Sequence, residues 1–541
     1  MDKYDGNSTK HHQMKKIKSI IIVGGGTAGW LAAGFYSSQL RDISITVIES
    51  DSVPIVGVGE SVVPQFRTHL AKMGLDEDTW LRESGSTFKY GVTFENWRTG
   101  SDLRWHGFGD FLTEKAINRS WQEYGKRPSM NPVDTVLCAD YWIEMLKSGM
   151  ITEQEIPWYA GDTYHLVRNN RAHRTLDGHQ YTSRVPGYAY NINAFRIGQT
   201  IKNHVSLPRG VQHLRRHIAR VEYDDAGAIT ELVDSLGDHH RADLYVDCTG
   251  FRRLLIGPVA QSKWISFDQR LTCKNAVGGR VNYEDDQEIF CAPHTHTVAM
   301  SSGWVWRIPL RDDIGSGYVY DSRFINEEQA VEEISQYWRS LGKHWDHKVS
   351  LKFDQGVMDR SAHQNIIACG LSSNFLEPLE ATSISFTTLI NELVVAVLNK
   401  HDNHWDAGKA EVVSRLMKRE VKYTGDFLWA HYALTQRTDS EFWRMQGQNR
   451  QEAKDMCHSW FRWHMSDIYR REKDFDHTRY NKYDWAQMIT TQRIYEDCPT
   501  RPIDPALLPR ARLLYQFQDQ MSQSLLDIVP THWQLIQHIN R

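Results

Sequence analysis

A glycine-rich turn between an apolar strand and a helix is the feature that most constrains how this chain folds. Residues 17–23 (IKSIIIV) are nearly all apolar, which is typical of a strand buried on both faces of a parallel sheet. GGGTAG follows at once, and the next residues, to about Leu40, predict a helix. A second apolar strand is expected at 43–49 (ISITVIE). This order predicts a βαβ unit that opens an α/β fold.

The spacing of the glycines predicts a dinucleotide site. Gly24 permits the tight turn, Gly26 lets the backbone approach a pyrophosphate, and Gly29 lets helix and strand pack closely. The N-terminus of the helix offers N–H groups to the phosphates. Glu49 ends the second strand, 20 residues after Gly29, where an acidic side chain binds ribose hydroxyls. The alternative is a glycine-rich turn that binds no ligand.

The rest of the chain favours FAD over NAD as the nucleotide. The sequence carries one such glycine fingerprint, and a later apolar strand at 242–251 (ADLYVDCTGF) ends in a glycine turn. A late strand that returns beside the first is typical of FAD-monooxygenase-type folds. With no second fingerprint, a built-in NAD(P)H site is not expected. The reducing electrons would then come from another protein.

No Pro/Gly linker divides the chain cleanly, so we expect interleaved domains and not separate ones joined end to end. Residues 1–16 are polar and predict a disordered tail. A Rossmann-like FAD module is expected at 17–400, with substrate-side segments inserted at about 100–190. Residues 401–541 predict a mainly helical substrate-side region packed on the module, and the helical character is expected to begin at about residue 326. Further β segments are expected at 88–97, 272–283, 297–310 and 316–320.

Composition and charge argue against several classes of function. The 63 Lys and Arg nearly balance the 67 Asp and Glu, for a net charge of −4, and no basic block marks a nucleic-acid-binding surface. The seven cysteines form no CxxC pair and predict reduced thiols in a cytoplasmic protein. The polar N-terminus predicts no secretory signal, and the apolar stretch 384–398 is too short and polar to span a membrane. No histidine pattern predicts a metal site.

Two tryptophans in GWVWRIPL (303–310) lead to a family resemblance. If this segment is a strand, Trp304 and Trp306 lie on one face, because side chains alternate along a strand. The segment is similar to the GWxWxIP signature of the flavin-dependent tryptophan halogenases. Further segments resemble that family in the same order: GGGTAGW (24–30), GVGESVVP (57–64), FKYGVTFENW (88–97), VDCTGFRRLLI (246–256), GLSSNFLEPLEATSI (370–384) and HYALTQRTDSEFW (431–443).

The resemblance implies an enzyme that uses reduced FAD, dioxygen and a halide ion to make hypohalous acid. The acid then travels through the protein to a lysine beside an aromatic substrate. In such an enzyme Trp304 and Trp306 would wall the flavin off from the substrate and so suppress direct hydroxylation. Plain core packing is the alternative for these two rings. A separate NAD(P)H-dependent flavin reductase is the expected partner, and a homodimer is possible.

Lys89 and Glu380 match the two essential residues of the family. The alternation of 88–97 places Lys89 on the face opposite Phe88 and Tyr90, which for an isolated lysine usually means solvent. In the family context it points into a channel, where an ammonium would orient hypohalous acid and a neutral amine would form a haloamine. Glu380 would stabilise the cationic ring intermediate and take its proton. Its alternative is a carboxylate that stabilises a helix start, and Glu377 is expected to be structural.

A helix is expected to begin just after Glu380, because apolar residues recur at helical spacing from Phe386. The resemblance places the halide at this helix start, against Thr382 and Ser383. The sequence departs from the family's Glu-Ser-Thr-Gly, since Ala381 and Ser383 replace Ser and Gly, so chloride and bromide both remain open. Flavin contacts carried over by motif are Thr27, Ala28, Asp51, Ser61, Leu371 and Ile384.

The substrate pocket is expected near Trp105-His106-Gly107-Phe108, which resembles the segment that stacks on the indole. His106 and Phe108 are the expected ring contacts, and Trp463 is a candidate for a second wall. The C-terminal part does not clearly resemble the stretch that clamps the amino and carboxylate groups of tryptophan. Bare indole, or an indole-bearing compound, is therefore as plausible a substrate as tryptophan.

Two other functions compete with halogenation. An FAD-dependent aromatic hydroxylase on the same fold predicts a Gly-Asp flavin motif near the last flavin strand, but Leu371-Ser372 follows Gly370. A flavin-binding sensor without turnover would not need Lys89 and Glu380 together.

Overall fold

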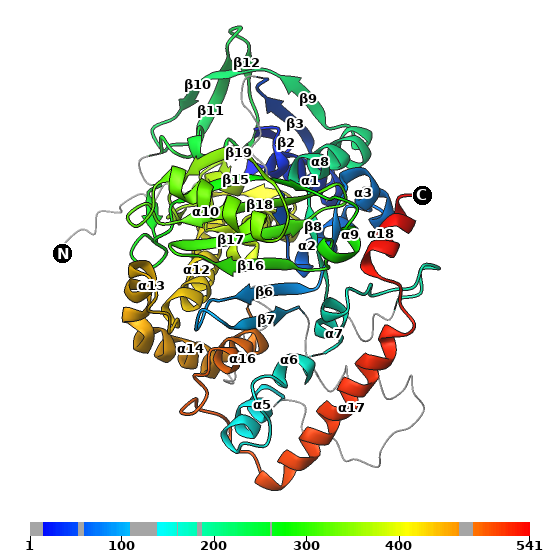
Figure 1. Ribbon diagram of the computed structural model, residues 1–541. Coiled ribbons are helices and arrows are strands. Elements are labelled where there is room, and N and C mark those ends of the chain that lie inside the picture. Colours follow the sequence, from blue (N-terminus) through cyan, green and yellow to red (C-terminus); the bar gives the residue numbers. More distant parts are fainter. Residues whose placement is uncertain are drawn as a thin grey trace, which may run out of the picture.

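Two large β-sheets form the framework of the protein, and helices pack around them (Figure 1). The computed structural model describes residues 15–51, 59–108, 138–159, 161–180, 187–259, 262–464 and 480–541.

The six-stranded sheet holds the glycine turn and is parallel except at one edge. Strand β13 pairs in parallel with β2, so the late strand does return beside the first, as predicted. Strand β22 continues the parallel sheet beyond β13, and β21 pairs with β22 in the antiparallel sense. The order is β21 (Ala362–His363), β22 (Ile366–Ala368), β13 (Leu244–Asp247), β2 (Ser19–Val23), β3 (Ser44–Glu49) and β9 (Gln212–Arg215).

Helix α1 (Thr27–Gln39) connects β2 to β3 and confirms the predicted βαβ unit. It packs against α8 (Ala194–Ile201) and α11 (Thr382–Lys400), whose sequences are distant from its own. Helix α11 is long and apolar enough to cross a membrane by composition, but 72% of its apolar window is buried inside the protein. Its apolar residues are therefore accounted for by packing in the core.

The seven-stranded sheet is antiparallel apart from the β16–β6 pair. The predicted strand at 88–97 is two strands, because Tyr90 leaves the ladder and bonds to Pro293 O instead, at 2.8 Å. The first piece, β5 (Thr87–Lys89), joins a small sheet with β8 (Ala189–Ile192) and β4 (Glu60–Ser61). The large sheet runs β19 (Trp345–Lys352), β15 (Asn275–Asn282), β18 (Asp313–Tyr320), β17 (Gly303–Pro309), β16 (Thr295–Ala299), β6 (Gly91–Glu95) and β7 (Leu103–Gly107).

One face of this sheet joins the tryptophan pair to the predicted substrate segment. Residues that lie opposite each other in a ladder point to the same face. Trp306 pairs with Thr297, and Thr297 pairs with Phe94. Across the next ladder Phe94 pairs with Arg104, and Val92 pairs with His106. Trp304, two residues from Trp306, and His106, two residues from Arg104, therefore share this face.

The expectation of mostly helical structure from residue 326 is wrong up to residue 375. Helix α10 (Glu327–Ser340) is followed by five strands before α11 begins. Strand β19 is an edge strand whose side chains are largely exposed, so its sequence, WDHKVSLK, lacks the apolar run of a buried strand. The others are too short for a periodic signal; besides β21 and β22 they are β20 (Gly356–Met358) and β23 (Asn374–Phe375).

The C-terminal part covers the β6–β7 end of the large sheet (Figure 1). Helix α16 packs on β7, and α14 packs on both α12 and α16. Lys15 and Lys16, expected to belong to the tail, form strand β1 against β24 (His404–Trp405). The helices are α12 (Ala407–Ala433), α13 (Glu441–Gln446), α14 (Arg450–His464), α16 (Lys482–Thr491), α17 (Leu508–Leu526) and α18 (His532–Ile539).

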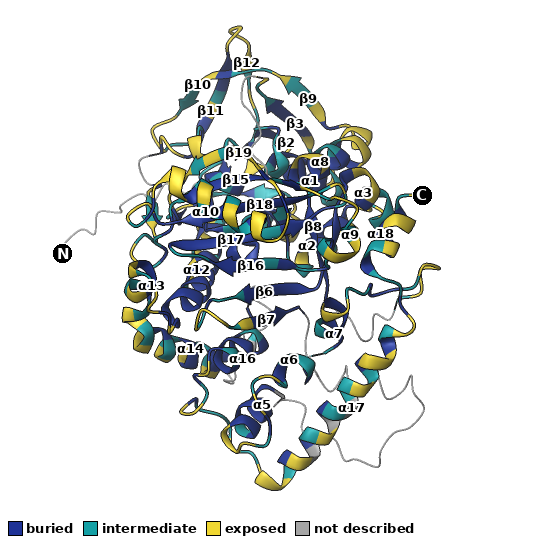
Figure 2. Ribbon diagram, in the orientation of Figure 1, coloured by how far each residue is buried: buried dark blue, intermediate teal, exposed yellow. Residues whose placement is uncertain are grey.

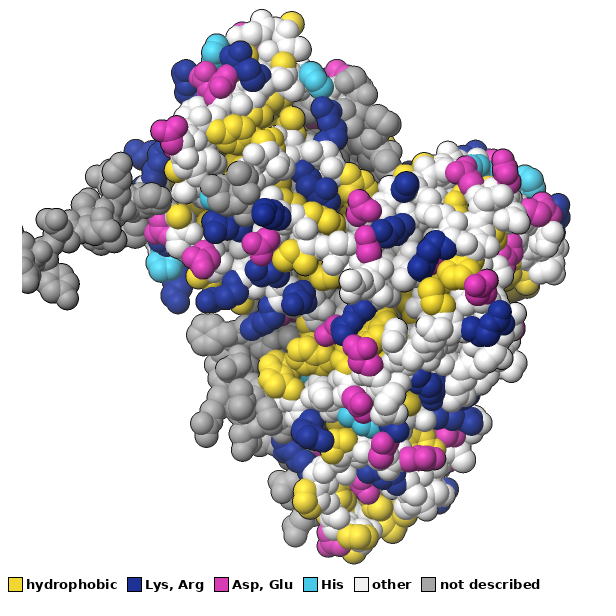
Figure 3. Space-filling model, turned by 90° about the vertical axis from the view of Figure 1, so that its left-hand side faces the viewer, with side chains coloured by type: hydrophobic (Ala, Val, Ile, Leu, Met, Phe, Trp, Pro, Cys, Tyr) yellow, Lys and Arg dark blue, Asp and Glu magenta, His cyan; other side chains and the backbone are white. Residues whose placement is uncertain are grey.

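The remaining described elements lie around the two sheets. The strands of both large sheets are mostly buried, whereas the outward faces of α10 and α17 are exposed (Figure 2). On the face drawn in Figure 3, basic and acidic side chains are intermingled. The helices and strands that lie around the two large sheets are α2 (Pro64–Lys72), α3 (Glu77–Ser84), α5 (Cys138–Lys147), α6 (Ile156–Tyr159), α7 (Asp162–Arg168), α9 (Gln287–Phe290), β10 (Ile218–Tyr223), β11 (Ile229–Asp234), β12 (His239–His240) and β14 (Trp264–Ser266).

Candidate active site

The glycine turn has the geometry that a pyrophosphate needs. Gly24 has φ of +114°, and a Cβ there would lie 2.3 Å from the carbonyl oxygen of Cys248. At Gly29 a Cβ would lie 1.9 Å from the carbonyl oxygen of Gly24, so helix and turn touch. Gly26 caps α1, and a Cβ at Gly26 would meet no atom of a described residue within 4 Å. The space beside Gly26 therefore lies open in front of the helix N-terminus, where an anion binds.

Glu49 lies at this turn, as expected of a ribose-binding acid. Its carboxylate sits over Gly25, where an added Cβ would be 1.5 Å from Oε2. The other carboxylate oxygen lies 2.7 Å from His213 Nε2, a partner on β9 that the sequence did not indicate. Asp51 points outward: its side chain is 66% exposed and pairs with Arg215 at 3.1 Å.

The predicted flavin contacts Ala28 and Leu371 come together through Gly370. Gly370 has φ of +68°, and a Cβ there would lie 2.8 Å from the Ala28 Cβ. Leu371 follows in a short 3₁₀ helix whose Ser372 hydroxyl donates to the buried Asp247 carboxylate at 3.0 Å. Ile384 is buried in the first turn of α11, the helix that packs on α1.

Ser61 and Thr27 are held by other protein groups. Ser61 Oγ lies 2.8 Å from Thr295 Oγ1 and 3.2 Å from Asn191 Oδ1, which joins β4, β8 and β16. The Thr27 hydroxyl donates to the carbonyl oxygen of Ala194 at 2.8 Å. These two side chains fix the walls around the turn. The open space beside Gly26 and the acid at Glu49 fit FAD, which would lie along the glycine turn and α1.

The start of α11 fits a small anion. Ala381 caps the helix in the left-handed conformation, with φ of +58°, and the first turn carries no acidic side chain. The Thr382 hydroxyl is buried and makes no hydrogen bond to any residue in the described ranges. Ser383 follows it and is half-buried. A halide would take a hydrogen bond from that hydroxyl and from the N–H groups of the helix start.

Lys89 is buried in the protein interior and not exposed to solvent. Its side chain is 0% exposed, and Nζ donates to the carbonyl oxygen of Val62 at 3.3 Å. The same atom lies 5.0 Å from the centre of the Phe108 ring. Burial lowers the pKa of Lys89 to about 7, against the opposing attraction of Glu380. The structure thus brings Lys89, Phe108 and Glu380 into one neighbourhood.

Glu380 is a buried carboxylate between two histidines. Its Oε1 lies 2.8 Å from His106 Nδ1 and 3.2 Å from His431 Nε2. The second nitrogen of His106 lies 3.1 Å from Asp484 Oδ1, on α16. His106, expected to stack on the substrate, is therefore an ionic partner of Glu380 as well. The rings of Phe427 and Tyr480 lie next to it, at centroid distances of 5.4 and 6.3 Å.

Charge pairing decides the protonation of this group. Burial opposes the charged form of His106, but Glu380 and Asp484 outweigh it and raise the pKa of His106 to about 10. Burial likewise opposes the ionised form of Glu380, yet His106 and His431 hold the pKa of its carboxyl well below the usual range. Burial lowers the pKa of His431 to about 4. At neutral pH Glu380 is a carboxylate and His106 is an imidazolium, with a neutral His431 beside them.

Glu377 lies three residues before Glu380, and its pKa is shifted in the opposite direction. It is fully buried, and its Oε2 accepts a hydrogen bond from Tyr432 at 2.9 Å. Burial raises the pKa of Glu377 to about 8, against the opposing bond from Tyr432. A neutral carboxylic acid suits the structural part expected of this residue.

The tryptophan pair forms a buried aromatic layer. The rings of Trp304 and Trp306 lie 6.2 Å apart, and Trp97 lies 6.1 Å from Trp304. Trp463 is elsewhere on α14, where its ring contacts Trp460 at 5.7 Å and His464 at 4.9 Å.

Sequence reasoning missed two of the polar residues around Glu380. His431 lies inside a segment that resembles the family, HYALTQRTDSEFW, so a signal was present. Asp484 lies in KYDWAQMITT, where nothing distinguishes it from the cap of a helix.

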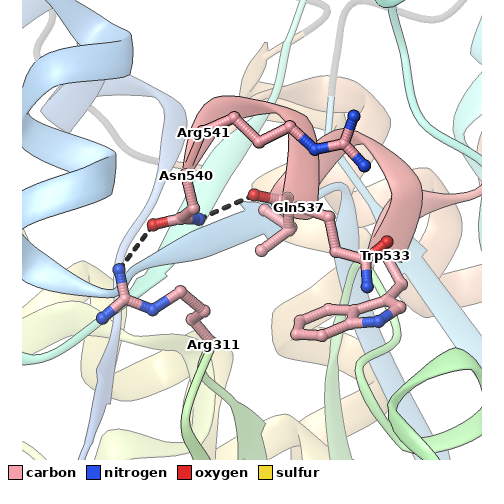
Figure 4. Close-up of a pocket in the computed structure, with 6 residues that line it drawn as sticks. Arg311, Trp533, Gln537, Asn540 and Arg541 are labelled. Atoms are coloured by element: carbon pink, nitrogen blue, oxygen red, sulfur yellow. Dashed lines mark hydrogen bonds between the residues drawn. The ribbon is translucent and has the colours of Figure 1, made fainter.

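A surface cavity of about 290 Å³ lies away from this group, beside α18 (Figure 4). It is lined by Trp533, Gln537, Asn540 and Arg541 of the C-terminal segment and by Arg311. The Arg311 guanidinium donates hydrogen bonds to Asp312, to Asn540 and to the carbonyl oxygen of Arg82. This cavity contains none of the predicted site residues.

Comparison with known proteins identifies the family. The family model described as tryptophan halogenase matches residues 19–504. The chain is 32% identical over 450 residues to the tryptophan 7-halogenase RebH of Lentzea aerocolonigenes, covering 79% of this chain and 78% of that protein. It is 31% identical over 435 residues to the tryptophan 6-halogenase ThaL of Streptomyces albogriseolus, with the same coverage.

Solved structures share the fold. The crystal structure of a tryptophan halogenase from Shewanella frigidimarina has a TM-score of 0.81 and 24% identity, over 97% of this chain and 98% of that one. The family match spans the glycine turn, Lys89, the tryptophan pair and Glu380. The chain therefore belongs to the flavin-dependent tryptophan halogenase family.

Proposed function

We propose that this enzyme halogenates an indole-bearing aromatic molecule, with Lys89 and Glu380 as the catalytic residues. The observation that carries the proposal is the burial of an amine within electrostatic reach of a carboxylate that stays ionised. Burying both groups costs stability, and such a cost is typical of a functional site.

Bound FAD supplies the reduced flavin that, with dioxygen and halide, gives hypohalous acid. Gly26 and the N-terminus of α1 would hold its pyrophosphate, and Glu49 would hold its ribose. Thr382 and Ser383 hold the halide at the start of α11. The layer of Trp304 and Trp306 separates this chamber from the substrate, because two packed indoles exclude both water and a second aromatic molecule.

Lys89 receives hypohalous acid and orients it. Its ammonium donates a hydrogen bond to the oxygen of the acid, which makes the halogen the electrophilic end. With a pKa near 7, the side chain is partly protonated at neutral pH. Phe108 covers the amine and directs the substrate ring toward it.

Glu380 completes the reaction on the ring. Its carboxylate stabilises the cationic ring intermediate and takes the proton from the halogenated carbon. The contact with His106 fixes the carboxylate in one orientation. Because α12 and α16 supply His431 and Asp484, we assign residues 401–541 to the substrate side of the enzyme.

Reconstitution tests the proposal. The enzyme is mixed with FAD, a flavin reductase, NADH and either indole or tryptophan, in chloride or bromide. Mass spectrometry is expected to show the isotope pattern of a halogenated product. A hydroxylated product would support an aromatic hydroxylase instead, and flavin oxidation without any product across a panel of indoles would contradict catalysis altogether.

A further inference from the structure

Arg104 is a buried arginine, and two of its three guanidinium nitrogens make no hydrogen bond to a described residue. Its side chain is 5% exposed. Nε and Nη2 are buried, and neither makes a hydrogen bond to any residue in the described ranges. The closest acid is Asp102, whose Oδ2 lies 3.6 Å from Nε, too far for a hydrogen bond. That carboxylate already accepts from the backbone N–H groups of Arg98 and Thr99.

A neighbouring arginine shows how this fold satisfies such a group when the role is structural. Arg437 is 8% exposed. Its Nε and Nη2 donate to Asp439 at 2.9 and 2.6 Å, and its Nη1 donates to the carbonyl oxygen of Asn96 at 3.0 Å. All three guanidinium nitrogens of Arg437 are thus hydrogen-bonded, and Nη1 holds the turn after β6. Arg104 has comparable burial without these bonds, so structural need does not explain its guanidinium.

The position of Arg104 connects it to the active site. It lies two residues before His106 on β7 and on the same face of the sheet. Its guanidinium carbon lies 5.1 Å from the centre of the Phe94 ring, and Phe94 stacks on His431 at 4.3 Å. The charge of Glu380 acts on Arg104, and the charge of Arg104 acts on His431.

The surroundings of Arg104 favour an anion. Arg98 is a neighbouring cation, and Arg450 and Arg493 are in turn neighbours of Arg98. Asp102 is the paired acid, and burial lowers the pKa of Arg104 to about 10 despite it. The guanidinium therefore stays charged at neutral pH, and Arg98 adds a second positive charge near it, with Asp102 and Glu380 as the opposing acids. A buried cation with unmet donors is stabilised by a bound anion.

We propose that Arg104 binds a carboxylate on the aromatic substrate, and so makes the enzyme selective for indoles that carry an acidic side arm. This assignment rests on the proposed halogenase function. Residues two apart on a strand lie about 7 Å apart, so a ring held near His106 would place a two- or three-carbon acid at Arg104. The planar guanidinium matches a carboxylate through two parallel hydrogen bonds.

The test compares indole-3-propionate with indole in wild type and in Arg104→Met. The ratio of kcat/KM for the acid to kcat/KM for indole is expected to fall about 10- to 100-fold in the variant, the range of a hydrogen bond to a charged group. Arg104→Lys keeps the charge but lacks the two parallel donors of the guanidinium, so it should recover part of the wild-type kcat/KM ratio. Arg339→Met, an exposed arginine on α10, is the control that leaves the ratio unchanged.

Stability separates a binding role from a structural one. Arg104→Met should leave the Tm unchanged or raise it, because it removes a buried charge whose Nε and Nη2 donors are unmet by the described residues. Arg437→Met should lower the Tm. An unchanged substrate ratio in Arg104→Met, or an equal loss on both substrates together with a lower Tm, would overturn the proposal.

Equilibrium binding keeps this test separate from the halogenase function. Calorimetry of the FAD-bound enzyme should show tighter binding of indole-3-propionate than of indole, and Arg104→Met should abolish the difference. If no substrate is halogenated but this difference persists, the proposed function fails and the carboxylate site stands. Sodium chloride or phosphate could raise the Tm of the wild type but not that of Arg104→Met, while indole and indole-3-propionate bind alike. In that case the site takes free anions and the proposal fails.

Discussion

His106 Nδ1 lies 2.8 Å from Glu380 Oε1, and this contact joins strand β7 to the turn before α11. The other nitrogen of the ring lies 3.1 Å from Asp484 Oδ1. An imidazolium that is held between two carboxylates cannot rotate without losing one of them. Glu380 therefore presents its carboxylate in a fixed direction. The residues that fix it are distant in sequence, because Asp484 lies more than 100 positions after Glu380 and His106 more than 270 positions before it.

Asp484→Asn is expected to weaken this arrangement in a pH-dependent manner. Loss of one carboxylate should lower the pKa of His106 by roughly one to three units, while Glu380 still holds it above its usual value. Activity should be close to wild type at pH 6 and fall progressively between pH 7 and 9, as His106 loses its proton. Rates across this range, with ¹⁵N NMR of the His106 ring, measure the effect.

Asparagine keeps the helix cap, because its side-chain oxygen can still accept from the N–H group of Asn481. A loss of activity that is the same at every pH would indicate that Asp484 acts on the fold alone.

Glu380→Gln and Glu377→Gln should have opposite consequences, although the two residues are three positions apart. Glu380 is ionised, so its replacement should lower halogenation by roughly 10²- to 10⁴-fold, the usual contribution of an acid–base group. Glu377 has a pKa of about 8 and is neutral at pH 7, so an amide is a close substitute and activity should change little. Rates of product formation by mass spectrometry distinguish the two.

Stability gives a second readout for Glu377. The folded protein holds this proton up to about pH 8, whereas the unfolded chain loses it near the ordinary glutamate pKa of 4.5. The contribution of Glu377 to the free energy of unfolding therefore decreases as pH rises from 4.5 to 8. Glu377→Gln should remove that part of the pH dependence, and an unaltered Tm–pH curve would contradict a buried neutral acid.

Lys89→Met is expected to abolish halogenation and to stabilise the fold. The folded-state pKa of about 7 lies below the ordinary lysine pKa of 10.5, so the unfolded chain binds more protons between these pH values. Stability from this group rises with pH over that window, and its full penalty is present below pH 7. The variant should therefore exceed the wild-type Tm most at pH 6 and least near pH 10, by scanning calorimetry. A lower Tm at pH 6 would show that the amine is structurally required.

Much of the flavin side was predictable from the sequence, because its signals are local. Gly24, Gly26 and Gly29 have fixed spacing, and the strands around them are apolar runs. The substrate side depends on contacts between distant segments. The alternation of 88–97 separated Lys89 from Phe88, but it did not indicate that both side chains are buried. Alternation reports a strand and says nothing of what packs on it.

The features that the sequence did not predict all lack a local sequence pattern. Asp484 caps α16 and contacts His106 with the same side chain, and only the first role leaves a local pattern. Arg104 sits where β7 would be expected to carry an apolar residue, yet one arginine in a strand gives no indication of its burial. The strands after α10 were missed because β19 is an exposed edge and the others contain two or three residues.

Thr382→Val should raise the KM for halide while leaving FAD binding intact. The hydroxyl is buried without a hydrogen-bond partner among the described residues, so valine removes only a donor that is available to an anion. Loss of one such hydrogen bond corresponds to roughly a 10-fold weaker affinity. Ser385→Ala, on the same helix, is the control. Steady-state rates against chloride and bromide measure the change, and an unaltered KM for both ions would remove Thr382 from the halide site.

Gly26→Ala and Gly29→Ala test the cofactor site with one methyl group each. At Gly26 the methyl meets no atom of the described residues within 4 Å, so the protein should fold with a nearly unchanged Tm in the absence of FAD. The same methyl occupies the space for the pyrophosphate, so FAD affinity should fall at least about 10-fold. At Gly29 the methyl would lie 1.9 Å from the carbonyl oxygen of Gly24, and the fold itself should be destabilised. Fluorescence titration with FAD and thermal melting of the FAD-free protein separate the two effects. Wild-type FAD affinity in Gly26→Ala would mean that the cofactor lies elsewhere than against this turn.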